Sequence, residues 1–369
     1  MTKNKSLSVF IGCLFVVFLF TDENVYSQKF KKRLSLKIST GTMYDDNILK
    51  YSDKYIEKFL RSEDEGRFSI KSYDDVAVKN RLSASYYFRI FNKKKTKISG
   101  NFSYNYYINN DIKSFNVYSI GVQQYFLKKA SFKLSYSYIP EFYVRNFRDE
   151  DLVSLYGYTP EAFSPYIFSK DNYSFYVQNI FLKNLYVNLS ASMAKYYHNI
   201  HYTEYDSDNY SLGLNLQKSV TKKTRLGFGY KFTNSDAKGY DEVFETVETS
   251  EESDGSYDDH RFEVSLKSKL PRLMKHNNDI SLKLRFSKRN FLSEKLIEID
   301  PLHASRVDNV YYVSLQYNFK YYKSNVVSLY YNRYQRDTDN FTDNYYELLN
   351  EEKAYRQNQL GFQISYALF

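Results

Sequence analysis

Basic side chains recur at every second position of segments whose alternate positions are apolar. Lys283 and Arg285, for example, flank Leu284. On an extended chain this spacing places the basic and the apolar side chains on opposite faces. Nine residues in this phase are the candidates for a basic inner surface: Arg81, Arg89, Lys97, Lys133, Arg225, Lys231, Lys267, Lys283 and Arg285.

A surface of this kind would favour anions if it enclosed water. A low-dielectric wall focuses a field of one sign into an aqueous bore, and rings of basic residues favour anions in pores. Glu263 is nearly the only acidic residue in the same phase. Two other interpretations stay open. The basic side chains could lie at rims, beside turns and lipid headgroups, or they could pair with acids on a loop folded inward.

Histidines offer the other chemistry to consider, as metal ligands or general bases. One set able to ligate a metal is close in sequence: His198, His201, Glu204, Asp206 and Asp208. These residues fall in an expected loop, where solvated polar side chains are the ordinary outcome. No histidine shares the outer face of an expected strand with a serine. We therefore predict that the protein is not an enzyme and holds no cofactor and no metal.

The elements that must position the basic residues are strands, because apolar and polar residues alternate with period two. We expect an all-β fold, an antiparallel up-and-down transmembrane β-barrel of about fourteen strands, within a range of roughly 12 to 16. The expected strands are Leu34–Tyr44, Arg81–Ile90, Lys97–Ile108, Val117–Phe126, Ser131–Ile139, Tyr173–Phe181, Leu185–Tyr196, Tyr210–Gln217, Arg225–Phe232, Phe262–Leu270, Ile280–Ser287, Tyr311–Phe319, Val326–Arg333 and Asn358–Leu368.

The connections support a barrel because short and long ones alternate, as periplasmic turns and external loops do. The short ones are Phe91–Thr96, Leu127–Ala130, Leu182–Asn184, Lys218–Thr224, Pro271–Asp279 and Lys320–Asn325. The longest ones are Asp45–Asn80, Pro140–Asn172, Asn234–Arg261, Lys288–Val310 and Tyr334–Gln357. The 41 Tyr and 29 Phe residues also suit a barrel, which uses aromatic girdles at both membrane interfaces.

The N-terminal segment has the pattern of an export signal. Lys3 and Lys5 precede an apolar run from Val9 to Phe20, which is too short to span a bilayer as a helix. Cleavage is expected near Ser27. The expected organisation is therefore a signal peptide over residues 1–27 and one outer-membrane barrel domain over residues 28–369.

The last strand ends in an aromatic pattern of the kind used as a barrel assembly signal, carried by Tyr366, Leu368 and Phe369. Phe369 is out of phase with the lipid-facing row of that strand. The expected partners are outer-membrane lipid, lipopolysaccharide and the barrel assembly machinery, with a monomer favoured. Nucleic acid is not expected, because the basic residues are dispersed at strand spacing instead of gathered in a patch.

Fourteen tilted strands leave a wide bore. A spacing of about 4.8 Å and a tilt of about 40° give a backbone diameter near 28 Å, so either water fills the bore or a loop occludes it. The acidic segment Asp236–Asp259 is one candidate for such a loop. It could equally be a solvated external loop or a divalent-cation bridge to lipopolysaccharide.

The segment Thr40-Gly41-Thr42-Met43-Tyr44-Asp45-Asp46-Asn47 resembles the opening turn of several outer-membrane barrels. These include the barrels of surface lipoprotein assembly modifiers and of exopolysaccharide-associated outer-membrane proteins. The resemblance implies a bacterial outer-membrane barrel. The helical-repeat domain that precedes the barrel in the lipoprotein modifiers has no counterpart in this sequence. Independently, Asp45, Asp46 and Asn47 favour a turn out of the strand.

Taken together, these patterns predict an integral protein of the bacterial outer membrane that acts as a passive, porin-like channel for small polar or anionic solutes. Two alternatives stay open. One is a non-conducting barrel that serves as a surface scaffold or adhesion platform. The other is an export channel component for polysaccharide or lipoprotein.

Overall fold

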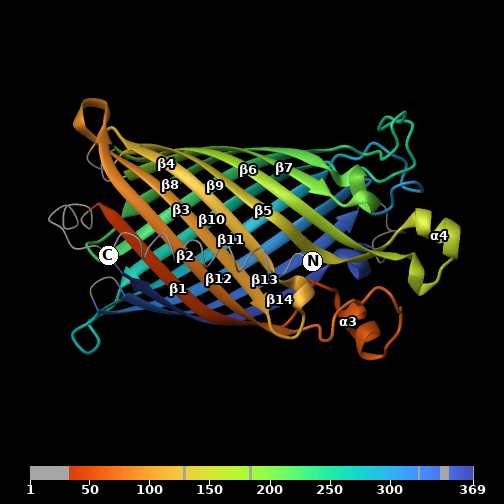
Figure 1. Cartoon of the computed structure of the whole chain (residues 1–369), viewed down its shortest axis with the longest axis horizontal. Helices are drawn as coiled ribbons and strands as arrows, with labels where there is room; N and C mark the ends of the chain where they lie inside the picture. The colour runs from red at the N-terminus through yellow and green to blue at the C-terminus, as the bar shows by residue number, and fades with distance from the viewer. Residues whose placement is uncertain (1–32, 128–129, 183–184, 323–324, 341–348, 369) are drawn as a thin grey trace, which may run out of the picture.

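The computed structural model describes residues 33–127, 130–182, 185–322, 325–340 and 349–368. Within them, fourteen antiparallel strands close into one barrel, with β1 paired to both β2 and β14 (Figure 1). The strands are β1 (Leu34–Asp45), β2 (Asp75–Ile90), β3 (Lys94–Tyr107), β4 (Phe115–Tyr125), β5 (Ser131–Arg148), β6 (Phe163–Leu182), β7 (Leu185–His198), β8 (Ser207–Ser219), β9 (Thr224–Ala237), β10 (Tyr257–Lys269), β11 (Asn277–Phe291), β12 (Arg306–Tyr322), β13 (Asn325–Asn340) and β14 (Tyr355–Ala367).

This architecture confirms the predicted all-β barrel and each of the fourteen expected strands. The expected signal peptide, residues 1–27, and the terminal Phe369 lie outside the described residues. Within the described part of the chain, no helix is long and apolar enough to cross a membrane.

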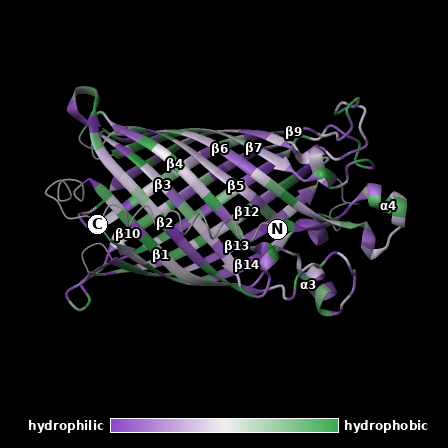
Figure 2. Ribbon diagram, viewed as in Figure 1, coloured by the Kyte–Doolittle hydropathy of each residue, from purple (hydrophilic) through white to green (hydrophobic). Residues whose placement is uncertain are grey.

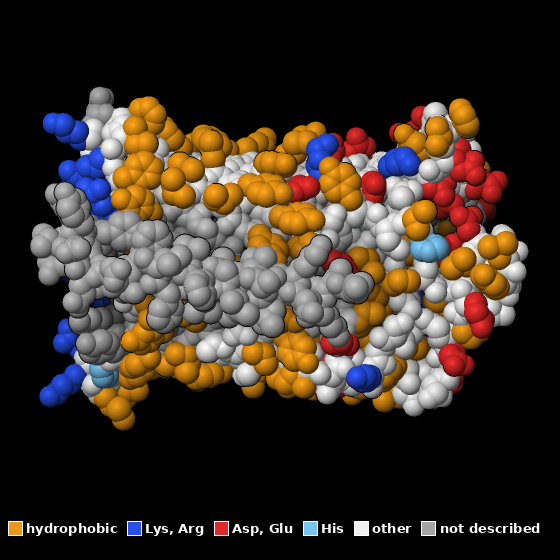
Figure 3. All heavy atoms as spheres, viewed as in Figure 1, with side chains coloured by type: hydrophobic (Ala, Val, Ile, Leu, Met, Phe, Trp, Pro, Cys, Tyr) orange, Lys and Arg blue, Asp and Glu red, His pale blue; other side chains and the backbone are white. Residues whose placement is uncertain are grey.

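One face of each strand is apolar and points away from the bore. Leu226, Leu266, Leu282 and Leu315 are neighbours across β9 to β12 and form one row. The opposite face holds small polar residues. Ser39 and Ser365, on the neighbouring strands β1 and β14, are hydrogen-bonded through their hydroxyls and are buried. Apolar side chains consequently form a band around the barrel (Figures 2 and 3).

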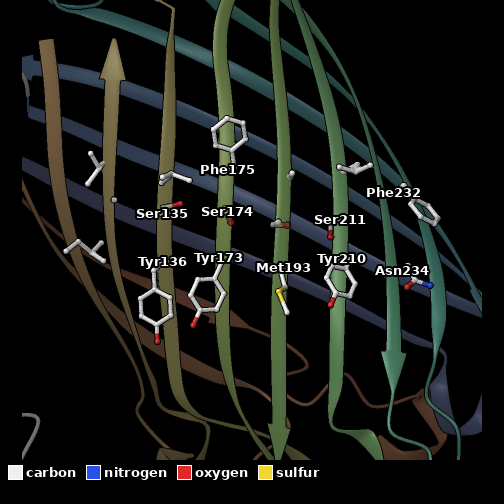
Figure 4. A pocket seen from close by; sticks show the side chains of 17 residues that line it. Ser135, Tyr136, Tyr173, Ser174, Phe175, Met193, Tyr210, Ser211, Phe232 and Asn234 are labelled. Carbon is white, nitrogen blue, oxygen red and sulfur yellow. The ribbon is translucent and has the colours of Figure 1, made fainter. Parts of the chain in front are cut away.

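Aromatic residues mark one edge of this apolar band. Tyr136, Tyr173, Met193 and Tyr210 are successive neighbours across β5 to β8 and lie side by side on the outer wall (Figure 4). The next outward-facing position along β7 holds Lys195, which forms an ion pair with Asp208 of β8 at 3.2 Å. The outer wall thus changes from aromatic to charged side chains within one outward-facing position. This change is typical of the aromatic girdle at a membrane interface, and here tyrosine takes the place that tryptophan often has.

The strands extend beyond the membrane on the side of the long connections, and here the sequence prediction is corrected. Most of the expected loop Pro140–Asn172 is strand, because β5 continues to Arg148 and β6 begins at Phe163. The alternation fails there because the pairing register shifts between Ile139 and Phe142 and again between Tyr143 and Arg145. Bulges of this kind re-aim side chains and can accommodate a proline.

The two ends of the barrel differ in structure and charge. The end where β1 begins and β14 ends carries the short turns, and Lys and Arg gather there (Figure 3). The other end carries α3 (Asp53–Leu60), α4 (Glu150–Tyr156) and many acidic side chains (Figures 1 and 3). The short 3-10 helices are η1 (Phe91–Lys93), η2 (Asp111–Lys113), η3 (Pro160–Ala162) and η4 (Ile200–Tyr205), which has a kink at Tyr202.

Close packing inside the wall depends on Gly361 of β14. A Cβ atom at this position would overlap the ring of Tyr330, its neighbour on β13. We expect Gly361→Val to destabilise the barrel by about 1–3 kcal/mol, the usual cost of overpacking. The measurement is the temperature at which the folded barrel converts to the unfolded form on a detergent gel. Gly100→Val is the matched control, because the atom nearest to a Cβ there is Ser119 O at 3.9 Å. Equal shifts for the two variants would contradict this assignment.

Candidate functional site

The segment after β1 enters the bore and builds a small core inside it. Ile48, Leu49 and Tyr51 are at most 3% exposed. They pack with inward-facing residues of the wall, among them Met43 of β1 and Tyr107 of β3. The loop that enters the bore is therefore the first one. The acidic segment Asp236–Asp259 reaches the bore only where it joins β10, and Asp259 is the acidic residue of β10 within this segment that takes the inward register.

A turn anchors this segment at the rim of the barrel. The Asp45 carboxylate accepts a hydrogen bond from the backbone N–H of Asn47, as expected for an Asx turn. The Asn47 amide donates to the carbonyls of Tyr51 and Arg356, which ties the loop to β14. Gln357 and Gln359 of β14 donate to the same Asp45 carboxylate. The expectation of a turn at Asp45 to Asn47 is confirmed.

Arg145 holds the loop from the other side of the bore. Its guanidinium donates to the carbonyls of Leu49 and Lys50 at 2.7 and 2.8 Å. It also lies over the ring of Tyr51, 4.7 Å from the centroid. Arg145 reaches this position because the second register shift of β5 immediately precedes it. The extension of β5 thus supports the loop that narrows the bore.

Between the loop and the opposite wall lies a chamber of about 620 Å³. Its charged lining is strongly basic. Among the described residues that line it, eight are basic and two are acidic: Lys50, Lys79, Lys113, Arg145, Arg261, Arg285, Arg289 and Arg336, with Asp45 and Asp308. We call this space the basic chamber.

Only some of these cations are neutralised. Arg261 pairs with Asp259 and Arg285 with Glu263, each at an N–O distance of 3.2 Å. Arg336 lies 3.7 Å from Asp308, a carboxylate that Arg306 binds more closely, at 2.7 Å. Within the described part of the chain, five others have no carboxylate oxygen within 4.0 Å, namely Lys50, Lys79, Lys113, Arg145 and Arg289. The basic chamber therefore keeps a net positive charge, which attracts anions in a confined, low-dielectric space.

Tyrosine rings hold several of these cations. The guanidinium of Arg285 lies 4.9 Å from the Tyr312 centroid, and that of Arg336 lies 4.8 Å from the Tyr355 centroid. The Lys50 ammonium is 5.6 Å from the rings of both Tyr334 and Tyr355. Cation–π contacts orient a cation without cancelling its charge, so these contacts preserve the positive potential.

Lys113 is the cation of the chamber that titrates near neutral pH. It lies in the loop between β3 and β4, and its ammonium donates to the carbonyls of Tyr143 and Val144. Burial, reinforced by the neighbouring charges of Lys50 and Arg145, lowers the pKa of Lys113 to about 7.

The nine sequence-predicted basic residues all lie on strand positions whose register puts them on the inward face with Ser39 and Ser365. They do not form one cluster. Arg285 alone of them lines the basic chamber. Lys231 lines the adjoining part of the bore together with Glu263 and Arg285, and Lys283 pairs with Glu263 at 3.3 Å. Arg81 lies on β2, where it donates to Asn101.

The remaining five lie towards the end with the short turns: Arg89, Lys97, Lys133, Arg225 and Lys267. Lys267 pairs with Asp279 at 3.1 Å. Lys97 lies within electrostatic range of Lys133 and Lys95. A role for any of the nine in solute passage stays a prediction.

The expectation that Glu263 is nearly the only inward acid is wrong. Asp259, Asp279 and Asp308 also face inward, paired with Arg or Lys side chains. All three lie in segments where the apolar alternation indicates a connection, whereas the strands extend through them. The same extension of the strands places Lys79, Arg289 and Arg336 in the wall of the chamber. Each lies an even number of residues from other inward-facing positions of its strand, so the alternation is a signal that could have identified it. Lys50, Lys113 and Arg145 lie on loops or beyond a bulge, where periodicity carries no signal.

Two histidines of the candidate metal set, His198 and His201, make local contacts at the end of the barrel with the long loops. His198 contacts Asp206 and Tyr166, whereas His201 pairs with Asp149 at 2.7 Å, so the two do not converge. Among the described residues, no group of three or more His, Cys, Asp and Glu side chains could hold a metal ion.

A closed barrel with an apolar outer band, aromatic girdle and polar bore is a structure that requires a lipid bilayer. The chain is an integral outer-membrane β-barrel.

Comparisons with known proteins found similarity to solved structures of outer-membrane proteins. No protein-family model and no curated protein matches the chain. A solved bacterial polysaccharide outer membrane secretin is 8% identical, with a TM-score of 0.44, covering 91% of this chain and 99% of that one. An anion-selective porin from Comamonas acidovorans is 9% identical, with a TM-score of 0.42, covering 91% and 98%. These likenesses concern the barrel alone.

The clamp formed by Arg145 predicts a change in loop docking. Arg145→Met removes two charge-assisted hydrogen bonds, each worth about 1.5–3 kcal/mol, and should release the segment around Leu49 and Lys50. Digestion of intact cells with proteinase K should then cut residues 46–74 faster. Arg61→Met is the control, since Arg61 directly follows α3 in the same loop and its side chain is 67% exposed. Unchanged cleavage in the Arg145 variant would show that the clamp does not hold the loop.

Proposed function

We propose that this barrel is a passive, porin-like channel that prefers small anionic solutes, and that the basic chamber is its selectivity filter. The observation that carries this proposal is the eight-to-two excess of basic over acidic residues around a space inside the bore. A solute crossing the barrel would pass this chamber and the basic residues of the other end. Basic linings of this kind favour anions in pores.

The same proposal assigns no catalytic activity and no cofactor to the barrel. It is supported by the histidine contacts at the mouth, which are made to Asp and Tyr side chains that also pack the loops. Outer-membrane lipid, lipopolysaccharide and the assembly machinery are the proposed partners. The apolar outer wall with its tyrosine edge supports the lipid contact (Figure 4). A monomer is the proposed state.

One observation favours a second candidate, a non-conducting barrel that acts as a surface scaffold. The first loop lies in the bore and has its own buried core. A loop that sealed the bore would leave the external segments as the functional surface. Conductance decides between the two candidates, because a sealed scaffold passes no ion current.

Replacing an unpaired cation of the chamber should weaken anion preference. One unit charge acting over about 10 Å in water is worth about 0.4 kcal/mol, so we expect Arg289→Gln and Lys50→Gln each to lower the anion-to-cation permeability ratio about twofold. The measurement is the reversal potential in a planar bilayer under a salt gradient. Lys288→Gln is the matched control, because Lys288 neighbours Arg289 on β11 but faces outward. No current at all, or a cation preference in the native protein, would exclude the anion channel.

The titration of Lys113 predicts a pH dependence of the same ratio. Because its pKa is about 7, Lys113 is charged at pH 6 and largely neutral at pH 8, so anion preference should fall as the pH rises through 7. The charged groups that act on it are Lys50 and Arg145, which lower its pKa, and Asp45, which raises it. Lys113→Met should remove the step without changing the ratio measured at pH 8. A step of equal size in this variant would assign the titration to another group.

A further inference from the structure

We infer that the short turns of the barrel form a binding surface for anionic glycerophospholipids of the surrounding membrane. Lys and Arg side chains of the turns contact the lipid phosphates, and the apolar side chains beside them enter the edge of the acyl layer. The inference is independent of ion conduction, because it concerns side chains of the turns and of the outward face. It rests on the orientation in which short turns lie on the periplasmic side of the membrane, where the leaflet is built of glycerophospholipids.

Positive charge is almost unopposed at this end of the barrel. Asp279 is the only acidic residue among the described residues of the short turns and the strand ends beside them. Lys267 and Lys320 already bind it from the inward face, at 3.1 and 3.4 Å. Seven other cations lie on the turns or beside them on the outward face: Lys93, Lys94, Lys218, Lys222, Lys223, Arg272 and Lys275. We call these seven residues the turn cations.

The turn cations depend on their surroundings for a counter-charge. All seven are exposed, and within the described part of the chain none of them has a carboxylate oxygen within 4.0 Å. Several Lys or Arg side chains held close to a membrane are attracted to anionic headgroups, and the attraction adds up over the residues. The charge of this end therefore complements a surface of lipid phosphates.

Each turn that carries these cations also exposes a large apolar side chain. Phe91 of the β2–β3 turn is 71% exposed, Val220 of the β8–β9 turn is 55% exposed and Met274 of the β10–β11 turn is 80% exposed. The boundary between headgroups and acyl chains accommodates such side chains, whereas water does not. A lysine beside them can keep its aliphatic stem in this boundary and its ammonium at the phosphates. The combination therefore fits a lipid surface better than a dissolved anion.

The direction of the turns also favours lipid. In Figure 1 the β2–β3 turn, drawn in orange, and the β10–β11 turn, drawn in blue-green, project sideways beyond the outline of the barrel wall. Because the strands are tilted, a hairpin that continues past the apolar band runs out over the adjacent headgroups. A partner docked over the mouth of the bore would instead meet the inward-facing residues of this end.

The opposite membrane interface has a different charge. Beyond its tyrosine row, the outward-facing Lys195 is neutralised by Asp208 at 3.2 Å, and many acidic side chains follow at that end (Figure 3). Anionic headgroups would be repelled there. The distribution of charge thus matches a lipid preference confined to the side of the short turns.

The test uses the purified full-length barrel in detergent micelles that contain equal amounts of phosphatidylglycerol and phosphatidylcholine. The two lipids carry the same acyl chains, and only phosphatidylglycerol has a net charge. Native mass spectrometry then counts the lipids that stay on the protein after washing. We expect phosphatidylglycerol to be retained at least about threefold more than phosphatidylcholine, because several cations act together. About 0.5 M NaCl should reduce this excess, because salt screens exposed charges.

Variants separate the turns from the bore. The combination of Lys222→Gln, Lys223→Gln, Arg272→Gln and Lys275→Gln should reduce the phosphatidylglycerol excess by about half or more, because it removes four of the seven turn cations. The matched control combines four changes on the inward face of the same end, namely Arg89→Gln, Lys97→Gln, Lys133→Gln and Arg225→Gln. It removes the same number of charges and should retain the excess. Heat-dependent mobility on a gel shows that each variant is folded.

Glycerol phosphate separates a lipid from a dissolved phosphate. It carries the headgroup charge without acyl chains, so it should leave the retained phosphatidylglycerol in place when added at the same concentration. Displacement of the lipid by glycerol phosphate would show that the turns bind a free phosphate group, and would overturn the lipid assignment.

The remaining outcomes keep this inference and the proposed function apart. Equal retention of the two lipids by the native barrel would overturn the inference, as would an unchanged excess in the folded turn variant. Loss of the excess in the inward-face control alone would place the phosphate in the bore and remove the turns from the assignment. The reversal potential of the native barrel tests the channel separately, so either proposal can fail while the other stands.

Discussion

Every backbone N–H and C=O group inside the hydrocarbon layer must find its partner within the protein, because lipid offers none. The pairing of β1 with β14 meets this requirement by removing both sheet edges. The rest of the molecule follows from closure. A closed sheet has one face toward lipid and one toward water, and the alternation of residues along each strand satisfies both environments at once.

Closure at this strand number also leaves a space that the wall cannot fill, and the first loop occupies part of it. The loop brings its own apolar core into the bore, centred on Ile48, Leu49 and Tyr51. Apolar residues there would be unfavourable in open water, but the inward faces of β1 and β3 cover them. Asn47 and Arg145 then satisfy the loop carbonyls that this packing buries. The shape of the chamber is set by how this loop docks.

The sequence predicted the strands well because each one obeys a local period set by its two environments. It predicted the chamber poorly because the chamber is made where that period fails. Arg145 follows a register shift and Lys50 lies on the loop, so neither belongs to an alternating pattern. The alternation does not identify Arg289 and Asp308 because β11 and β12 continue past the membrane into segments that have no apolar face. What a residue contacts across the bore depends on the docking of the loop, which no local pattern encodes.

The distribution of partners among the cations argues that the positive charge of the chamber is maintained by the fold. Arg306 of the wall is held by a two-pronged ion pair with Asp308, which cancels its charge. Arg145 and Lys113 are held instead by backbone carbonyls, and Lys50 by tyrosine rings. Carbonyls and rings fix a cation in position but leave its net charge in place. Two such cations about 10 Å apart repel by about 1.7 kcal/mol at an effective dielectric constant of 20. Water and counter-ions reduce this repulsion, and at Lys113 it adds to the effect of burial that lowers the pKa to about 7.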